Sequence, residues 1–122
     1  MSDKQRTIKK SVTLSGKGLH TGYAVDLTFQ PAPENHGIKF QRIDLDERPI
    51  IPASVDKVVD TSRGTTLEER GVKVHTIEHV MASLVGLGID NVLLEVSGPE
   101  MPIMDGSSKL IVEALKKAGT VE

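Results

Sequence analysis

Residues 77–97, IEHVMASLVGLGIDNVLLEVS, decide the fold class because the spacing of their apolar residues changes partway along the stretch. As far as residue 87 the apolar positions recur every three or four residues, which predicts an amphipathic helix. Gly86 and Gly88 are expected to end that helix. Residues 90–97 then alternate between apolar and other side chains, which predicts a strand. The alternating apolar positions are Val92, Leu94 and Val96.

Similar alternation predicts several strands on the N-terminal side of this helix. The clearest covers residues 23–30, and residues 38–41 alternate again, so residues 23–42 are expected to form a hairpin with a long loop. Residues 43–53 carry charges and prolines and are expected to be irregular. An edge strand is expected over residues 7–14, and shorter strands are expected within residues 55–67 and 72–74.

A second helix is predicted to run from a cap at Ser107 or Ser108 to a stop at Gly119. The order of strands, helix, strand, helix predicts an α+β fold, a two-layer sandwich with two helices packed on one face of a mixed or antiparallel sheet. The 122 residues are expected to form one domain, residues 1–122.

Composition excludes some classes of function. The chain has no cysteine, which rules out disulfides and thiolate zinc sites. A net charge of -2 and three aromatic residues (one Tyr and two Phe) are not typical of a nucleic-acid-binding protein. The polar N-terminus shows no signal peptide, and no apolar run is long enough to span a membrane. A cytoplasmic protein without nucleic-acid partners is therefore expected.

One cluster of residues has the chemistry of a catalytic site. His75 and His79 are four positions apart, so on a helix they would share a face, with Glu78 about 100° from His79. Imidazole binds zinc well, and a carboxylate beside a metal can move a proton from water to a leaving group. The spacing H-x-x-E-H is also that of inverzincin peptidases. The same residues would also fit a helix start without a metal. In that case His75 or Thr76 would be the N-cap and Glu78 a solvated residue of the first turn.

Two glycine-containing segments have less specific patterns. Residues 16–22 contain three glycines and His20, but no helix follows them as a phosphate-binding loop requires, so a tight turn is predicted. Asp105, in Asp105-Gly106-Ser107, is predicted to form a turn and helix cap.

Three stretches together resemble one enzyme family. They are Gly18-Leu19-His20-Thr21-Gly22, then Thr76-Ile77-Glu78-His79 continuing to residues 86–91, then residues 100–107, EMPIMDGS. In this order and at these separations they resemble the N-terminal domain of the UDP-3-O-acyl-N-acetylglucosamine deacetylases. These are bacterial zinc enzymes of the first committed step of lipid A synthesis. The resemblance extends from Arg6 to about Ala118.

The resemblance implies roles for individual residues. Glu78 would be the general base and His79 the single zinc ligand from this domain, while His75 would not be a ligand. Leu19, Ser62 and Arg63 would lie close to the substrate. The family's other zinc ligands, in an H-x-x-x-D motif, belong to a second domain, so this chain is expected to be the N-terminal half and to be inactive alone.

The resemblance also implies partners and a reaction. The partners would be the chain's own C-terminal catalytic domain and a UDP-sugar acyl lipid, whose 2-acetamido group is hydrolysed to release acetate. An isolated N-terminal half is expected to expose apolar surface and to self-associate. Two alternatives stay open on the sequence, an inverzincin-like metallopeptidase fragment using His75, and a non-catalytic binding module.

Overall fold

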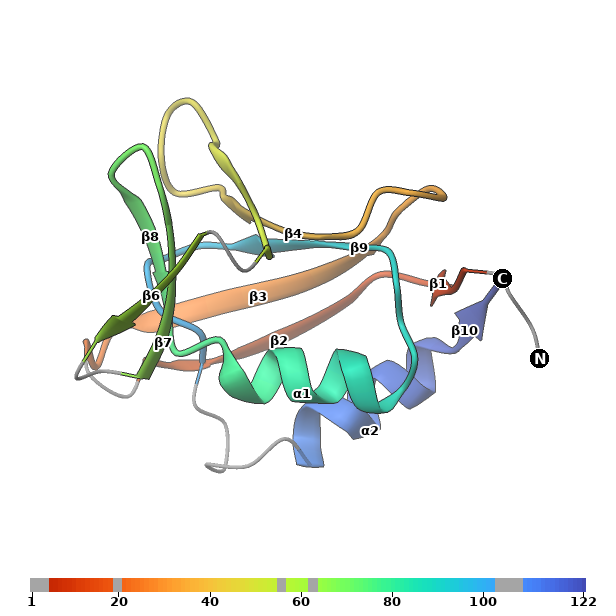
Figure 1. The fold of residues 1–122 in the computed structure, drawn as a ribbon. Coiled ribbons are helices and arrows are strands. Elements are labelled where there is room, and N and C mark those ends of the chain that lie inside the picture. The colour runs from red at the N-terminus through yellow and green to blue at the C-terminus, as the bar shows by residue number, and fades with distance from the viewer. Residues whose placement is uncertain (1–4, 19–20, 55–56, 62–63, 103–108) are drawn as a thin grey trace.

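The computed structural model describes residues 5–18, 21–54, 57–61, 64–102 and 109–122 (Figure 1). The elements, in chain order, are β1 (Thr7–Ile8), β2 (Val12–Lys17), β3 (Ala24–Pro31), β4 (Ile38–Arg42), β5 (Ile50–Pro52), β6 (Val58–Thr61), β7 (Gly64–Glu69), β8 (Val72–His75), α1 (Glu78–Gly86), β9 (Val92–Val96), α2 (Lys109–Ala118) and β10 (Thr120–Val121).

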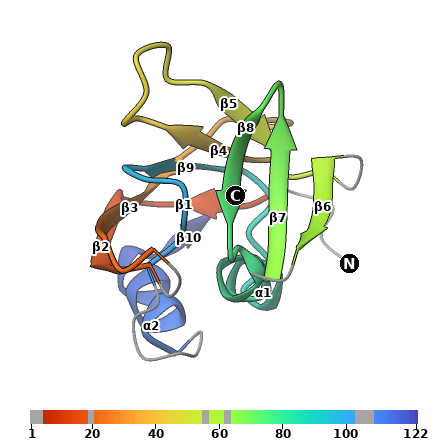
Figure 2. The same ribbon diagram turned by 90° about the vertical axis from the view of Figure 1, so that its left-hand side faces the viewer.

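The largest sheet is mixed and has five strands in the order β2-β3-β9-β4-β5. Strand β9 runs antiparallel to β3 and parallel to β4. Both helices lie on the same face of this sheet (Figures 1 and 2). The predicted α+β class, with two helices on one face of a mixed sheet, is confirmed.

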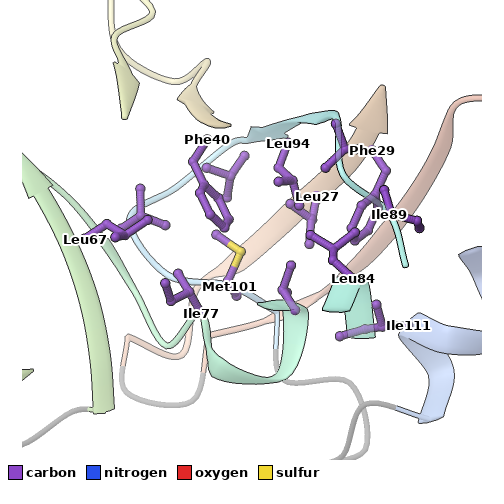
Figure 3. Close-up of a cluster of buried hydrophobic side chains, with 14 of the residues drawn as sticks. Leu27, Phe29, Phe40, Leu67, Ile77, Leu84, Ile89, Leu94, Met101 and Ile111 are labelled. Atoms are coloured by element: carbon purple, nitrogen blue, oxygen red, sulfur yellow. The ribbon is translucent and has the colours of Figure 1, made fainter. Parts of the chain in front are cut away.

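The core is centred on β9. Leu94 lies opposite Phe29 of β3 on one side and Phe40 of β4 on the other, and all three side chains are fully buried. They form a row across the sheet above the helices, facing side chains such as Leu84 and Ile111 (Figure 3). The alternating apolar residues that predict β9 are therefore also residues whose side chains fill the space between the sheet and the helices.

The predicted hairpin over residues 23–42 is wrong. Strands β3 and β4 do not pair with each other, because β9 lies between them and is hydrogen-bonded to both. Alternation shows which face of a strand is buried, but it does not show which strand lies beside it. Residues 43–53 also contain a strand, β5, which pairs with β4 through Ile51 and was not predicted.

A second, three-stranded sheet has the order β6-β7-β8 and is antiparallel throughout. It stands at one end of the larger sheet, next to the start of α1 (Figures 1 and 2). The short strands predicted within residues 55–67 and 72–74 are thus confirmed. The chain reverses between β7 and β8 at Arg70 and Gly71, which both have positive φ angles.

Both predicted helices are present, and both end near the predicted glycines. Gly88 follows α1 with a φ of 70°, and Gly119 follows α2 with a φ of 79°. Among the described residues, no helix is long and apolar enough to cross a membrane. Strand β1 pairs with β10, which brings the two ends of the described chain side by side.

Arg42 joins the two larger sheets. Its guanidinium is buried and donates to both carboxylate oxygens of Asp44, at 2.8 Å from Nε and 2.7 Å from Nη2. The remaining nitrogen, Nη1, donates to the carbonyl oxygen of Lys73 in β8 at 3.0 Å. Since a fixed, planar guanidinium can hold several acceptors at once, this one side chain ties β4 to β8.

This contact predicts an acid-dependent part of the folding stability. The hydrogen bond from Arg42, aided by its charge, holds the pKa of Asp44 below its usual value of 3.8. A lowered pKa stabilises the fold above the unfolded-state pKa, and the contribution is lost as pH falls through the folded-state value. Asp44→Asn should therefore lower the free energy of unfolding at neutral pH by about 1–2 kcal/mol. The difference from wild type should shrink below pH 3.8.

Urea unfolding at a series of pH values measures this difference. Asp46→Asn, which changes an exposed carboxylate in the same loop, is the matched control. A pH-independent difference between wild type and Asp44→Asn would contradict the proposed link to the Asp44 charge.

Candidate functional site

The turn between β8 and α1 sets the geometry of the site. His75 is the last residue of β8, Thr76 has a φ of 62°, and α1 begins at Glu78 with Ile77 as its N-cap. The backbone N–H groups of Thr76 and Ile77 both donate to the carbonyl oxygen of Thr65 in β7, at 2.9 and 3.3 Å. A β-branched residue at positive φ costs roughly 1–3 kcal/mol, so surrounding contacts must hold it.

The predicted N-cap at His75 or Thr76 is therefore wrong. Ile77 caps the helix, and among the described residues no side chain accepts a hydrogen bond from its first turn. The Thr76 hydroxyl has a different partner, the carboxylate of Glu100, because the positive φ of Thr76 turns the chain before the helix starts.

Glu78 and His79 are the first two residues of α1, and both are exposed. Val80 and Leu84 on the same helix are buried against the core, which fixes the rotation of the helix and leaves Glu78 and His79 facing outward. The backbone N–H of Thr65 lies 3.4 Å from Glu78 Oε1, at the long end of hydrogen-bond range. Glu78 also lies in the first turn of α1, at the positive end of the helix dipole.

His75 does not share a helix face with His79. It belongs to β8, where its backbone pairs with Thr66, and its Nδ1 is 2.9 Å from the Thr66 hydroxyl. The spacing H-x-x-E-H therefore spans a strand end, a turn and a helix start, and the helical inverzincin arrangement is wrong for this chain. Among the described residues, no three His, Asp or Glu side chains are grouped to hold a metal ion.

Glu100 is a buried carboxylate that the sequence patterns did not single out as functional. Its side chain is 2% exposed. Oε1 accepts the backbone N–H of Thr21 at 3.0 Å, and Oε2 accepts the Thr76 hydroxyl at 2.9 Å. One feature of the sequence could have indicated this role. Glu100 is a charged residue among apolar neighbours in Pro99-Glu100-Met101-Pro102, and a charged side chain that is buried in such a segment usually has bonding partners.

Two hollows in the surface lie away from Glu78 and His79. One, between β2 and α2, has a volume of about 420 Å³, and the other, between the β4–β5 and β7–β8 loops, about 700 Å³. Neither is lined by Glu78 or His79, so these hollows are not the basis of a substrate site at the start of α1.

The family of the chain follows from its match to a family model. The model of the UDP-3-O-acyl N-acetylglycosamine deacetylase family matches residues 5–122. The chain belongs to this deacetylase family. The resemblance predicted from three sequence stretches is thereby confirmed along nearly the whole chain.

Individual relatives of the deacetylase family support the same assignment. The chain is 56% identical over 119 residues to the bifunctional enzyme LpxC/FabZ of Bacteroides thetaiotaomicron, covering 98% of this chain and 26% of that protein. It is 52% identical to the UDP-3-O-acyl-N-acetylglucosamine deacetylase of Myxococcus xanthus and 48% identical to that of Xanthomonas campestris pv. campestris. These two matches cover 97% of this chain and 38% and 39% of the relatives. The chain thus spans well under half the length of these relatives.

The predicted substrate-contacting residues of this deacetylase-family chain lie outside the part that the structure describes. They are Leu19, Ser62 and Arg63, and the same holds for His20 and Asp105. The described residues on either side of Leu19 and His20 contact the segment around Glu100. Gly18 pairs with Pro102 in a β-bridge, and Thr21 is bound by Glu100.

Proposed function

We propose that this chain is the N-terminal part of a zinc-dependent UDP-3-O-acyl-N-acetylglucosamine deacetylase that removes the sugar N-acetyl group in lipid A biosynthesis. The match of the family model over residues 5–122 carries the proposal. The exposed pair Glu78 and His79 at the start of α1 supports it, because a base and a metal ligand must both be open to substrate. The cytoplasmic location stays a prediction from the sequence.

Glu78 and His79 have distinct parts in this proposal. Glu78 takes a proton from the water that attacks the amide carbonyl carbon and passes it to the amide nitrogen, so that the C–N bond breaks and the free amine and acetate are released. The long contact from the Thr65 N–H leaves that carboxylate available for this proton transfer. Leu19, Ser62 and Arg63 are proposed to contact the substrate.

The described residues fit zinc only in part. The exposed imidazole of His79 suits zinc, but a catalytic site needs three protein ligands, and no such group occurs among the described residues. His79 would be one ligand, and a C-terminal catalytic domain would provide the others. Zinc, when bound, supplies the Lewis acidity that polarises the amide carbonyl.

Zinc content separates the roles of the two histidines. In the full-length protein, His79→Ala should lower zinc affinity at least about 100-fold, since loss of a ligand should exceed the 10–100-fold cost of losing a hydrogen-bond partner of a ligand. His75→Ala is the matched control and should keep zinc and most of the activity. Metal analysis after dialysis and an assay of acetate release from UDP-3-O-acyl-N-acetylglucosamine measure the two effects. Absence of acetate release by wild type, or loss of zinc only in His75→Ala, would contradict the proposal.

A further inference from the structure

The buried carboxylate of Glu100 connects three separate parts of the chain. It binds the Thr21 backbone N–H at 3.0 Å and the Thr76 hydroxyl at 2.9 Å. Its own segment is joined to the end of β8, because the His75 N–H donates to the Pro99 carbonyl at 2.7 Å and the Met101 N–H donates to the His75 carbonyl at 3.2 Å. All three parts carry the family's sequence stretches, which are residues 18–22, residues 76–79 and the stretch that begins at Glu100.

We propose that Glu100 is a positioning residue that holds Thr76 in its left-handed conformation and thereby sets the direction of the first turn of α1, which carries Glu78 and His79. This inference rests on the proposed function, because it assumes that Glu78 and His79 do the chemistry. A threonine at positive φ keeps that conformation only while its surroundings hold it. In the described hydrogen bonds that hold it, the Thr76 hydroxyl donates to the Glu100 carboxylate and the Thr76 backbone N–H donates to the Thr65 carbonyl oxygen.

The packing of Gly18 against Glu100 gives independent support. Gly18 is buried, and a Cβ atom built on it would collide with Glu100 Oε1 and with the Thr21 hydroxyl. The Glu100 carboxylate is therefore held by hydrogen bonds on one side. On the other side it fits against residue 18 only because that residue has no side chain. A methyl group at that position should push the carboxylate away from both Thr21 and Thr76.

Thr76 variants of the full-length protein test the positioning role by kinetics. Thr76→Val keeps the branched shape and loses the hydroxyl, and Thr76→Ser keeps the hydroxyl. We expect Thr76→Val to lower kcat roughly 10–100-fold, because a small displacement of reacting groups can slow the chemical step by this much. The KM for UDP-3-O-acyl-N-acetylglucosamine should change less than about threefold. Thr76→Ser should stay within about twofold of wild type. A Thr76→Val protein with wild-type kcat and a lowered melting temperature would overturn the inference, because it would show a purely structural role.

A double-mutant cycle identifies Glu100 as the partner. Glu100→Gln removes the charge but keeps the shape, and the loss of kcat from Thr76→Val should be smaller in the Glu100→Gln background than in wild type. Fully multiplicative losses would overturn the pairing. A wild-type protein that releases no acetate would contradict the proposed function, whereas an active wild type with an equally active Thr76→Val variant would contradict only this inference.

Hydrogen exchange tests the connection without any activity. In Gly18→Ala, the Thr21 and Ile77 amides should exchange at least about tenfold faster than in wild type, because opening of local contacts exposes them. Gly98→Ala is the matched control, since its Cβ would meet only Val25, at an ordinary 3.5 Å. Equal exchange rates in Gly18→Ala and Gly98→Ala would overturn the role assigned to Glu100.

Discussion

Glu78→Gln in the full-length protein is expected to lower kcat for acetate release roughly 10²–10⁴-fold, the usual range for loss of a general base. The amide keeps the size of the side chain and still accepts a hydrogen bond from the Thr65 N–H. It cannot take a proton from water at neutral pH. Folding should be unaffected, because Glu78 is exposed and its contact with the Thr65 N–H is long, at 3.4 Å.

Zinc content distinguishes a lost base from a lost ligand. Glu78→Gln should bind zinc as wild type does, because His79 and not Glu78 is the proposed ligand. Glu113→Gln, on the exposed side of α2, is a matched control and should be fully active. The assignment of Glu78 as base would fail if Glu78→Gln kept more than about a tenth of wild-type kcat.

The largest expected effect on stability comes from Phe40→Ala. This side chain is fully buried and lies opposite Leu94, so its removal leaves a cavity between the central strands and the helices. Such truncations cost about 3–5 kcal/mol, a large share of the roughly 5–15 kcal/mol that stabilises a typical domain. The urea midpoint should fall by roughly 2 M, for a slope of about 1–3 kcal/mol per molar.

Tyr23→Ala is the control for this prediction. Tyr23 is the aromatic residue of the chain that lies outside the core, and it is 77% exposed. Its truncation should therefore change the free energy of unfolding by less than about 0.5 kcal/mol. Circular dichroism in the far ultraviolet follows both transitions. Similar midpoints for Phe40→Ala and Tyr23→Ala would contradict the central place of Phe40 in the core.

The elements that the sequence predicted well are those with local signals. Helix α1, strand β9 and the stops near Gly88 and Gly119 follow from spacing and from single glycines. The partners of β9 do not, because contacts between β3 and β9, such as the hydrogen bond from the Gln30 side chain to the Glu95 carboxylate, join residues 65 positions apart and leave no trace in either segment alone. This is why β3 and β4 were wrongly predicted to form a hairpin.

The candidate site shows the same division. The sequence pointed to Glu78 and His79 because their chemistry and position at a helix start are local features. The placement of His75 in β8 depends on pairing with Thr66, and the left-handed Thr76 depends on contacts with Thr65 and Glu100. These contacts are made by tertiary structure, so the spacing of the histidines alone suggested a helix face that does not exist.

The central position of β9 has a consequence for how the protein is made. Strands β3 and β4 leave the ribosome well before β9, yet each must wait for β9 to complete its hydrogen bonds. Until then a nascent chain presents unpaired strand edges beside Phe29 and Phe40, and such edges invite pairing with other chains. Closing a sheet from distant segments is also slow. The growing polypeptide therefore exposes these strand edges until β9 has been synthesised. Chaperones would bind the chain during this period, and slower translation before β9 would favour aggregation.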